Sequence, residues 1–187
     1  MGLFDNLKNN LKNEVNKAVQ NATNKTENIV FSKLPDTLEE FQALPQAAMS
    51  TPFDTAAMTV LALCFYPKDK DLSLTMLDFL RGPRPMSGID KSNIADRFRS
   101  KDYVPRSYFK GATPQNDYTP SEPYTITVSE NQYSYEVDGM AKLFIPSGGA
   151  DSPRPIQLRK AKDGKWYLWE QLLLADIRQP ESSNPWA

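Results

Sequence analysis

The polar residues whose types and spacing suit ligand binding gather in three segments. Gly82-Pro-Arg-Pro85 presents Arg84 in a proline-rich turn, and Ser147–Arg154 is a glycine-rich loop that carries Asp151 and Arg154. Successive backbone N–H groups in such a loop can form a nest for an anion. Together with the basic segment described next, they give these candidate ligand-binding residues: Arg84, Arg106, Tyr108, Lys110, Asp151 and Arg154.

The third segment, residues 97–110, interleaves basic and aromatic side chains. The forked guanidinium group of arginine binds oxyanions, and aromatic rings stack on nucleic-acid bases. This composition is therefore typical of a nucleic-acid-binding surface. The charged residues of 36–78 are mainly acidic and those of 81–112 mainly basic, while the whole chain carries a formal charge of only −1. The near-zero total favours a different interpretation, in which the two segments neutralise each other and the aromatic rings belong to the core.

A covalent mechanism has weak support in the sequence. Ser107-Tyr-Phe-Lys110 matches the Ser-x-x-Lys pattern, in which a lysine one helical turn away takes the proton of the serine. Pro105 and Gly111 flank the motif and disfavour the helix that this chemistry needs. The Gly-rich loop likewise lacks the Lys-Ser/Thr ending of a nucleotide-binding P-loop.

Two residue counts limit the possible chemistry further. The chain has no histidine and one cysteine, Cys64, which excludes Ser-His, Cys-His and His-metal arrangements. We therefore expect no catalytic residues, no metal site and no cofactor. A lone cysteine in an apolar run is expected to be a small core residue, and it suits a reducing, cytoplasmic compartment.

The first half of the folded part predicts helices. Thr37 with Glu40 is typical of a capping box, and Thr51-Pro-Phe-Asp54 predicts the start of a second helix that is apolar nearly all round and ends before Pro67. Further helices are predicted over 71–81, with Gly82 as the stop, and over 90–100.

The second half predicts strands. Residues 124–128 and 133–137 alternate β-branched and aromatic residues, and 140–145, 155–161 and 165–174 follow, with Asp163-Gly164 as a tight turn. Helices first and strands later predict an α+β fold, with N-terminal helices packed on a C-terminal antiparallel β-sheet.

Residues 1–32 differ in composition from the rest. Apolar residues recur between Phe4 and Ala22 at helical spacing, so 3–22 predicts an amphipathic helix followed by a linker. Its polar face is rich in Asn, and such a marginal helix needs a surface for its apolar stripe. That surface is its own domain, a second copy or a protein partner, and a membrane surface is disfavoured. Residues 33–187 then form a single α+β domain.

Several long motifs in the domain occur together in one order: Gly82–Pro85, Asp102–Pro114, Ser147–Pro155, Trp166–Gln171 and Asn184–Ala187. The region 33–187 thereby resembles an uncharacterised family of bacterial proteins, typical of gut anaerobes, classed as a domain of unknown function. The resemblance implies a bacterial origin and one domain, and it carries over no functional residue.

The sequence therefore favours a non-catalytic binding or protein-interaction protein. The alternative is a small-molecule pocket protein or enzyme on a scaffold like the cystatin or nuclear-transport-factor folds, which is an analogy of fold only. A concave pocket with Asp151, Arg154 or Arg106 converging in it would favour this alternative. Nucleic-acid binding through 97–110 is the third hypothesis.

Overall fold

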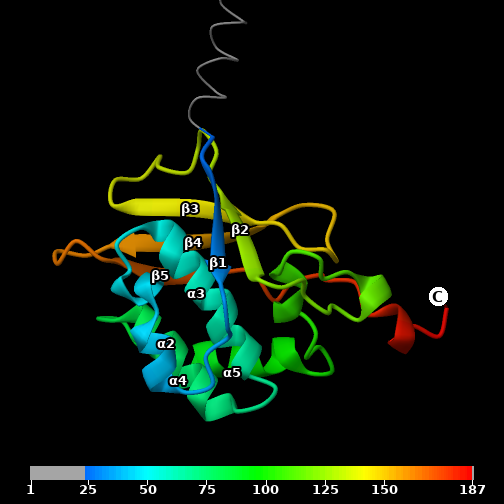
Figure 1. Ribbon diagram of the computed structural model, residues 1–187. Coiled ribbons are helices and arrows are strands. Elements are labelled where there is room, and N and C mark those ends of the chain that lie inside the picture. The colour runs from blue at the N-terminus through cyan, green and yellow to red at the C-terminus, as the bar shows by residue number, and fades with distance from the viewer. Residues whose placement is uncertain (1–23, 187) are drawn as a thin grey trace, which may run out of the picture.

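The computed structural model describes residues 24–186, which form two layers, with the helices gathered on one face of a sheet (Figure 1). The predicted helix over 3–22 lies outside the described residues. The elements in chain order are β1 (Thr26–Phe31), α2 (Leu38–Ala43), α3 (Pro52–Phe65), α4 (Lys70–Arg81), α5 (Gly88–Phe98), β2 (Tyr124–Ser129), β3 (Met140–Ile145), β4 (Arg154–Lys160) and β5 (Trp166–Gln171). Short 3-10 turns lie at Pro45–Ala48, Pro105–Tyr108, Pro114–Asn116 and Glu181–Ser183.

The sheet is antiparallel throughout, with strand order β1-β2-β3-β4-β5. The α+β class predicted from the sequence is thus confirmed. Helix α3 lies across the inner face and contacts all five strands. It is buried on nearly every side because its sequence is apolar all round, so it forms the centre of the core.

The first strand lies in the segment that the sequence assigned to the linker. Thr26–Phe31 was expected to belong to the linker, yet it pairs along its whole length with β2. Ile29 and Phe31 alternate into the core, while Asn28 and Val30 face outward. The folded sheet therefore begins at residue 26, before the predicted domain start at 33.

Residues 133–137 were expected to form a strand, and that prediction is wrong. The segment is a turn in which Asn131 Oδ1 accepts from the N–H of Tyr133 at 2.9 Å and the N–H of Asn131 donates to Ser134 Oγ at 2.9 Å. The alternating Tyr133, Tyr135 and Val137 are exposed, so the alternation does not mark a buried face. The Asn and Ser side chains of this turn form hydrogen bonds with backbone groups that a β-strand would use to pair with a neighbouring strand.

The helix starts follow the predicted local signals. At α3, the Thr51 side chain accepts from the N–H of Asp54, and Asp54 accepts from the N–H of Thr51. At α2, Thr37 accepts from the N–H of Glu40, but Glu40 accepts from the N–H of Asp36 instead of closing the predicted box on Thr37. Ser87 and Asp90 form a further capping box, which starts α5 at Gly88, before the predicted residue 90.

Buried hydroxyl groups join the layers at defined points. Thr55 Oγ1 donates to the carbonyl of Trp166 at 2.6 Å, which ties α3 to β5. Ser73 Oγ donates to the carbonyl of Ala62 at 2.7 Å, which ties α4 to α3. Each of these buried hydroxyl groups donates a hydrogen bond, so neither is left unpaired. The two bonds therefore fix the positions of α3, α4 and β5 relative to one another.

Among the helices of residues 24–186, none combines the length and the apolar character that crossing a bilayer requires.

Gly82 ends α4 and brings the chain close to β5. Its φ of +54° lies in the left-handed region, and a Cβ built on it would overlap the ring of Tyr167. A side chain at this position would therefore strain the backbone and push α4 and β5 apart. Gly139 also has a positive φ, +69°, but its Cβ position is open space.

Gly82→Ala should lower the free energy of unfolding by about 2–4 kcal/mol, because overpacking against Tyr167 adds to backbone strain. The matched control Gly139→Ala carries the backbone strain alone and should cost about 1–2 kcal/mol. Urea unfolding followed by circular dichroism measures both. Equal losses for the two variants would show that the contact with Tyr167 does not hold α4 against β5.

Candidate ligand-binding cleft

Two of the residues singled out from the sequence bind the protein's own backbone. Arg154 donates through Nε to the carbonyl of Ala175 at 2.9 Å and through a terminal nitrogen to the carbonyl of Asp176 at 2.7 Å. Tyr108 is buried and donates its hydroxyl to the carbonyl of Leu173, and burial raises the pKa of this phenol. Both side chains therefore fasten the segment that follows β5.

The other candidates are dispersed over the surface. Asp151 forms an ion pair with Arg178, and Arg106 and Lys110 are exposed. The backbone of Lys110 donates to the carbonyl of Thr125 at 2.8 Å, so this residue borders β2. Of the six candidates, Arg84 alone is among the residues that line the cleft described below.

The glycine-rich loop does not present a free anion nest. The N–H of Gly148 donates to the carbonyl of Ser107 at 2.9 Å, and the N–H of Gly149 donates to Ser147 Oγ at 3.1 Å. The N–H of Ala150 also bonds within the loop, to the carbonyl of Ser147. Since these donors are used internally, the loop packs against residues 107–113 and does not form the predicted kind of binding concavity.

Ser107 is buried and forms hydrogen bonds within the protein. It is 1% exposed, its hydroxyl donates to the carbonyl of Val104 at 2.7 Å, and it accepts from Ser147 Oγ at 2.7 Å. It lies in a 3-10 turn and Lys110 is exposed, so the serine is not presented to a substrate. Cys64 lies partly buried on α3, where burial raises the pKa of its thiol to about 12 against the opposing charge of Arg106.

The aromatic rings of the basic segment belong to the core. Phe98 stacks on Tyr66 with ring centroids 4.2 Å apart, and Phe109 packs edge-on against Tyr124. Tyr108 and Phe109 are only 2% and 3% exposed, so they are not available to stack on bases. Lys91 pairs with Asp78 at 3.6 Å across the acidic and basic segments, while Arg99 pairs locally with Asp96 at 2.9 Å.

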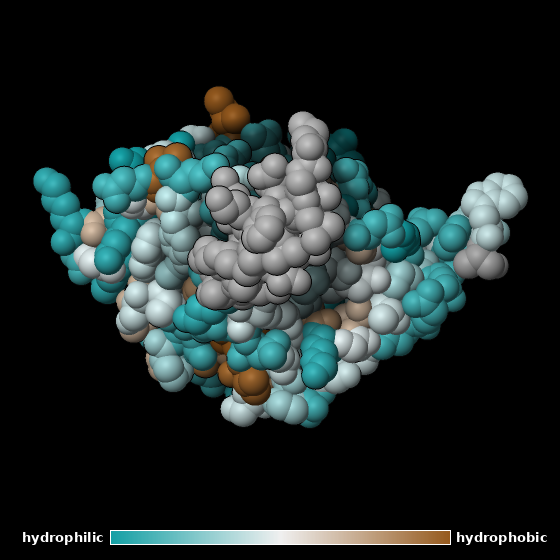
Figure 2. Space-filling view, turned by 90° about the horizontal axis from the view of Figure 1, so that it is seen from above, coloured by the Kyte–Doolittle hydropathy of each residue, from teal (hydrophilic) through white to brown (hydrophobic). Residues whose placement is uncertain are grey.

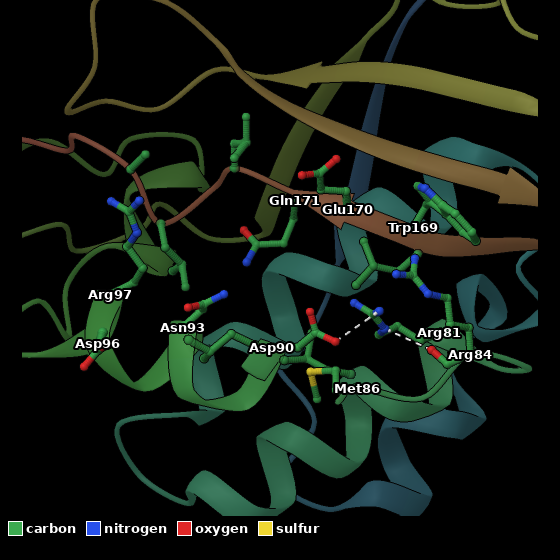
Figure 3. Close-up of a pocket in the computed structure, with 16 residues that line it drawn as sticks. Arg81, Arg84, Met86, Asp90, Asn93, Asp96, Arg97, Trp169, Glu170 and Gln171 are labelled. Carbon is green, nitrogen blue, oxygen red and sulfur yellow. Dashed lines mark hydrogen bonds and ion pairs between the residues drawn. The ribbon is translucent and has the colours of Figure 1, made fainter. Parts of the chain in front are cut away.

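A cleft of about 700 Å³ lies between the end of α4, helix α5, and β5 with the residues that follow it (Figure 3). Its lining joins guanidinium, amide, carboxylate and indole groups over an apolar base of Leu, Ile and Met side chains. The labelled residues in Figure 3 are Arg81, Arg84, Met86, Asp90, Asn93, Asp96, Arg97, Trp169, Glu170 and Gln171. The volume lies within the range of small-molecule sites, and the lining is more polar than is usual for them.

Helix α5 forms one wall of the cleft. Asp90, Asn93, Ile94 and Arg97 are spaced at i, i+3, i+4 and i+7, and all four line the cavity. This spacing places them on one face of a helix. The wall is thus a two-turn stripe of about 10 Å, with Asp90 at one end and Arg97 at the other.

Arg81 and Asp90 hold the corner between α4 and α5. Arg81 Nη2 lies 3.6 Å from Asp90 Oδ2, and Arg81 Nε donates to the carbonyl of Arg84 at 3.0 Å. Asp90 also accepts from the backbone of Ser87, and this bond is the main reason that its pKa is lowered, with the arginines adding to the effect. Asp90 is therefore ionised at neutral pH and already has partners.

Trp169 and Arg84 line the cleft at the same end as Arg81, and Arg159 packs on the same indole ring. The guanidinium carbon of Arg84 lies 4.3 Å from the centroid of the Trp169 ring, and that of Arg159 lies 4.6 Å from it. Both arginines are exposed. The indole thus orients two guanidinium groups by cation–π contact while their N–H groups stay available to a ligand.

Two amide side chains occupy the middle of the cleft. Asn93 comes from α5 and Gln171 from the end of β5, and they point toward each other in Figure 3. Gln171 Oε1 accepts from the N–H of Leu173 at 2.8 Å, which fixes the orientation of the amide. Its Nε2 group therefore faces the cleft as a donor.

Sequence reasoning missed most of these residues. The polar stripe on α5 was visible in the spacing of Asp90, Asn93 and Arg97, and it could have been found by asking which face of that helix is not apolar. Trp169 and Gln171 had no such signal, because the register shift in the β4–β5 pair, between Gln157 and Leu158, sets how their side chains are placed.

Among residues 24–186, no cluster of three or more acidic, cysteine or histidine side chains is arranged to hold a metal ion.

Arg154→Met should lower the free energy of unfolding by about 1–2 kcal/mol, because it removes charge-assisted bonds to two carbonyls of residues 175–176 at a partly exposed site. Arg106→Met, at an exposed arginine, is the matched control and should change stability by less than about 0.5 kcal/mol. Thermal and urea unfolding measure both effects. If Arg154→Met is as neutral as the control, Arg154 is not a structural clamp.

Comparison with known families adds one finding. Residues 33–181 match the family described as Domain of unknown function (DUF6935), and no curated protein or solved structure matches the chain. The matched range includes every residue that lines the cleft. Since it also covers most of the sequence, the chain belongs to the family Domain of unknown function (DUF6935).

Proposed function

We propose that this protein is a non-catalytic binding protein and that the cleft between α4, α5 and β5 holds a small anionic molecule. The observation that carries the proposal is the exposed guanidinium of Arg84, positioned over Trp169 at the edge of a cavity of about 700 Å³. An arginine held by an indole is an ordered bidentate donor for a carboxylate or phosphate.

The chemistry of the lining supports binding over transformation. Asp90 is engaged by Ser87 and Arg81, and Asp96 is engaged by Arg99. The chain has no histidine, and no serine, threonine, cysteine or lysine lines the cleft. Apart from the exposed carboxylate of Glu170, the remaining lining groups are hydrogen-bond donors, one indole and apolar side chains, and these groups recognise a ligand without supplying a nucleophile.

This proposal draws on the small-molecule alternative from the sequence more than on protein interaction. The coloured part of the face in Figure 2 is largely hydrophilic, with small, separate apolar patches. A protein partner for residues 3–22 stays a prediction. The burial of Phe98, Tyr108 and Phe109 removes the main support for nucleic-acid binding through 97–110.

We further propose a bacterial protein, from a gut anaerobe, that works in the cytoplasm. The motif resemblance supports the source, and the single Cys64, which cannot form an internal disulfide, suits a reducing compartment.

Arg84→Gln should weaken the binding of small anions at least tenfold, because one charge-assisted pair is worth about 1.5–3 kcal/mol. Isothermal titration calorimetry with benzoate, acetate and inorganic phosphate measures the effect at fixed ionic strength. Arg106→Gln removes the same charge outside the cleft and should leave affinity unchanged. Trp169→Phe should reduce any fluorescence change on binding, which assigns the signal to the cleft.

Two results would overturn the proposal. One is the absence of measurable binding of any of the three anions to the wild-type chain. The other is an equal loss of affinity in Arg84→Gln and Arg106→Gln, because this would indicate diffuse charge attraction instead of a built site.

A further inference from the structure

The cleft has a second cationic group at the end opposite Arg84. Arg97 lies at the last turn of α5 and its guanidinium lines the cavity, whereas Arg84 and Trp169 lie at the other end in Figure 3. Asp90, which contacts Arg81 near the first end, precedes Arg97 by seven residues of helix. Two helical turns, or about 10 Å, therefore separate the two ends along this wall.

The ion pairs show which charges remain for a ligand. Arg81 pairs with Asp90, and Asp96 pairs with Arg99 outside the cleft. Within the part of the chain that the structure describes, Arg84 and Arg97 make no ion pair. Glu170 also lines the cleft without an ion pair among these residues, and its carboxylate points away from α5 in Figure 3. Two separated positive charges thus line the cavity, Arg84 from the turn before α5 and Arg97 from the last turn of α5.

Between these two charges lie neutral donors and apolar side chains, together with Asp90, whose charge is paired with Arg81. Asn93 and the oriented amide of Gln171 lie in the middle in Figure 3, and Ile94 and Leu77 also line the cleft. A ligand that filled this cleft would place charge at its ends and an uncharged, partly apolar portion at its centre. A single phosphate or carboxylate would use only one end.

We infer that the ligand class is an elongated dianion with one carboxylate or phosphate on Arg84 and the other on Arg97. The inference rests on the proposed function, since it names the chemistry of the same cleft. The neutral centre lies against Asn93, Gln171 and Ile94, and the anionic end at Arg84 adjoins the face of Trp169. The length of the α5 stripe sets the span between the two anions.

The test compares straight-chain α,ω-dicarboxylates, from succinate to azelate, with monocarboxylates of equal chain length. Titration calorimetry at fixed ionic strength gives each affinity. We expect the longer dicarboxylates to bind the wild-type chain at least tenfold more tightly than their monocarboxylate partners, whereas succinate is too short to show this gain.

Variants assign the two ends separately. Arg97→Gln should remove the advantage of the long dicarboxylates over monocarboxylates of equal chain length, and Arg84→Gln should weaken both classes. Lys101→Gln removes a nearby charge that does not line the cleft and should change neither. Circular dichroism confirms that each variant is folded before its affinity is interpreted.

The outcomes separate this inference from the proposed function. If monocarboxylates bind through Arg84 and long dicarboxylates gain nothing, the dianion inference is wrong and the binding function stands. An advantage that survives Arg97→Gln, or that is lost equally in Lys101→Gln, also contradicts the inference. If no carboxylate binds at all, both the inference and the proposed function fail together.

Discussion

The corner between α4 and α5 depends on two charged side chains at the end of α4. Asp78 accepts from the N–H of Met86 at 2.7 Å and pairs with Lys91 at 3.6 Å, so one carboxylate binds both sides of the turn. Arg81, whose side chain is 10% exposed, binds the carbonyl of Arg84 and the carboxylate of Asp90. These contacts fix the direction in which α5 leaves α4, and so they set the width of the cleft between α5 and β5.

One residue at this corner, Asp90, both caps helix α5 and helps to shape the cleft. Asp90 closes the capping box of α5 through Ser87 and also neutralises Arg81. Because its charge is used twice for structure, the site keeps its positive character at Arg84 and Arg97 without a buried unpaired cation at Arg81. Gly82 contributes by letting the chain pass against Tyr167, which brings Arg84 within reach of Trp169.

Local signals account for the features that the sequence predicted well. The Thr51, Pro52 and Asp54 cap, the stop at Gly82 and the Asp163-Gly164 turn each depend on residues within one turn of one another, and the structure has all three. Strand β1 was missed because Asn28 and the exposed Val30 weaken its pattern, and only pairing with β2 makes it a strand. Residues 133–137 show the reverse case, since their alternation has no partner strand and no core to face.

The cleft was beyond sequence reasoning because the role of an arginine depends on acceptors far away in the chain. Arg154 and Arg84 each stand beside a proline in a loop-bordered segment, and both suggested oxyanion binding. Arg154 meets the carbonyls of residues 175 and 176, which use its donors, whereas Arg84 meets the face of Trp169, which orients the guanidinium and accepts none of its in-plane N–H groups. A carbonyl partner thus makes one arginine a structural clamp, and an aromatic partner leaves the other available to a ligand.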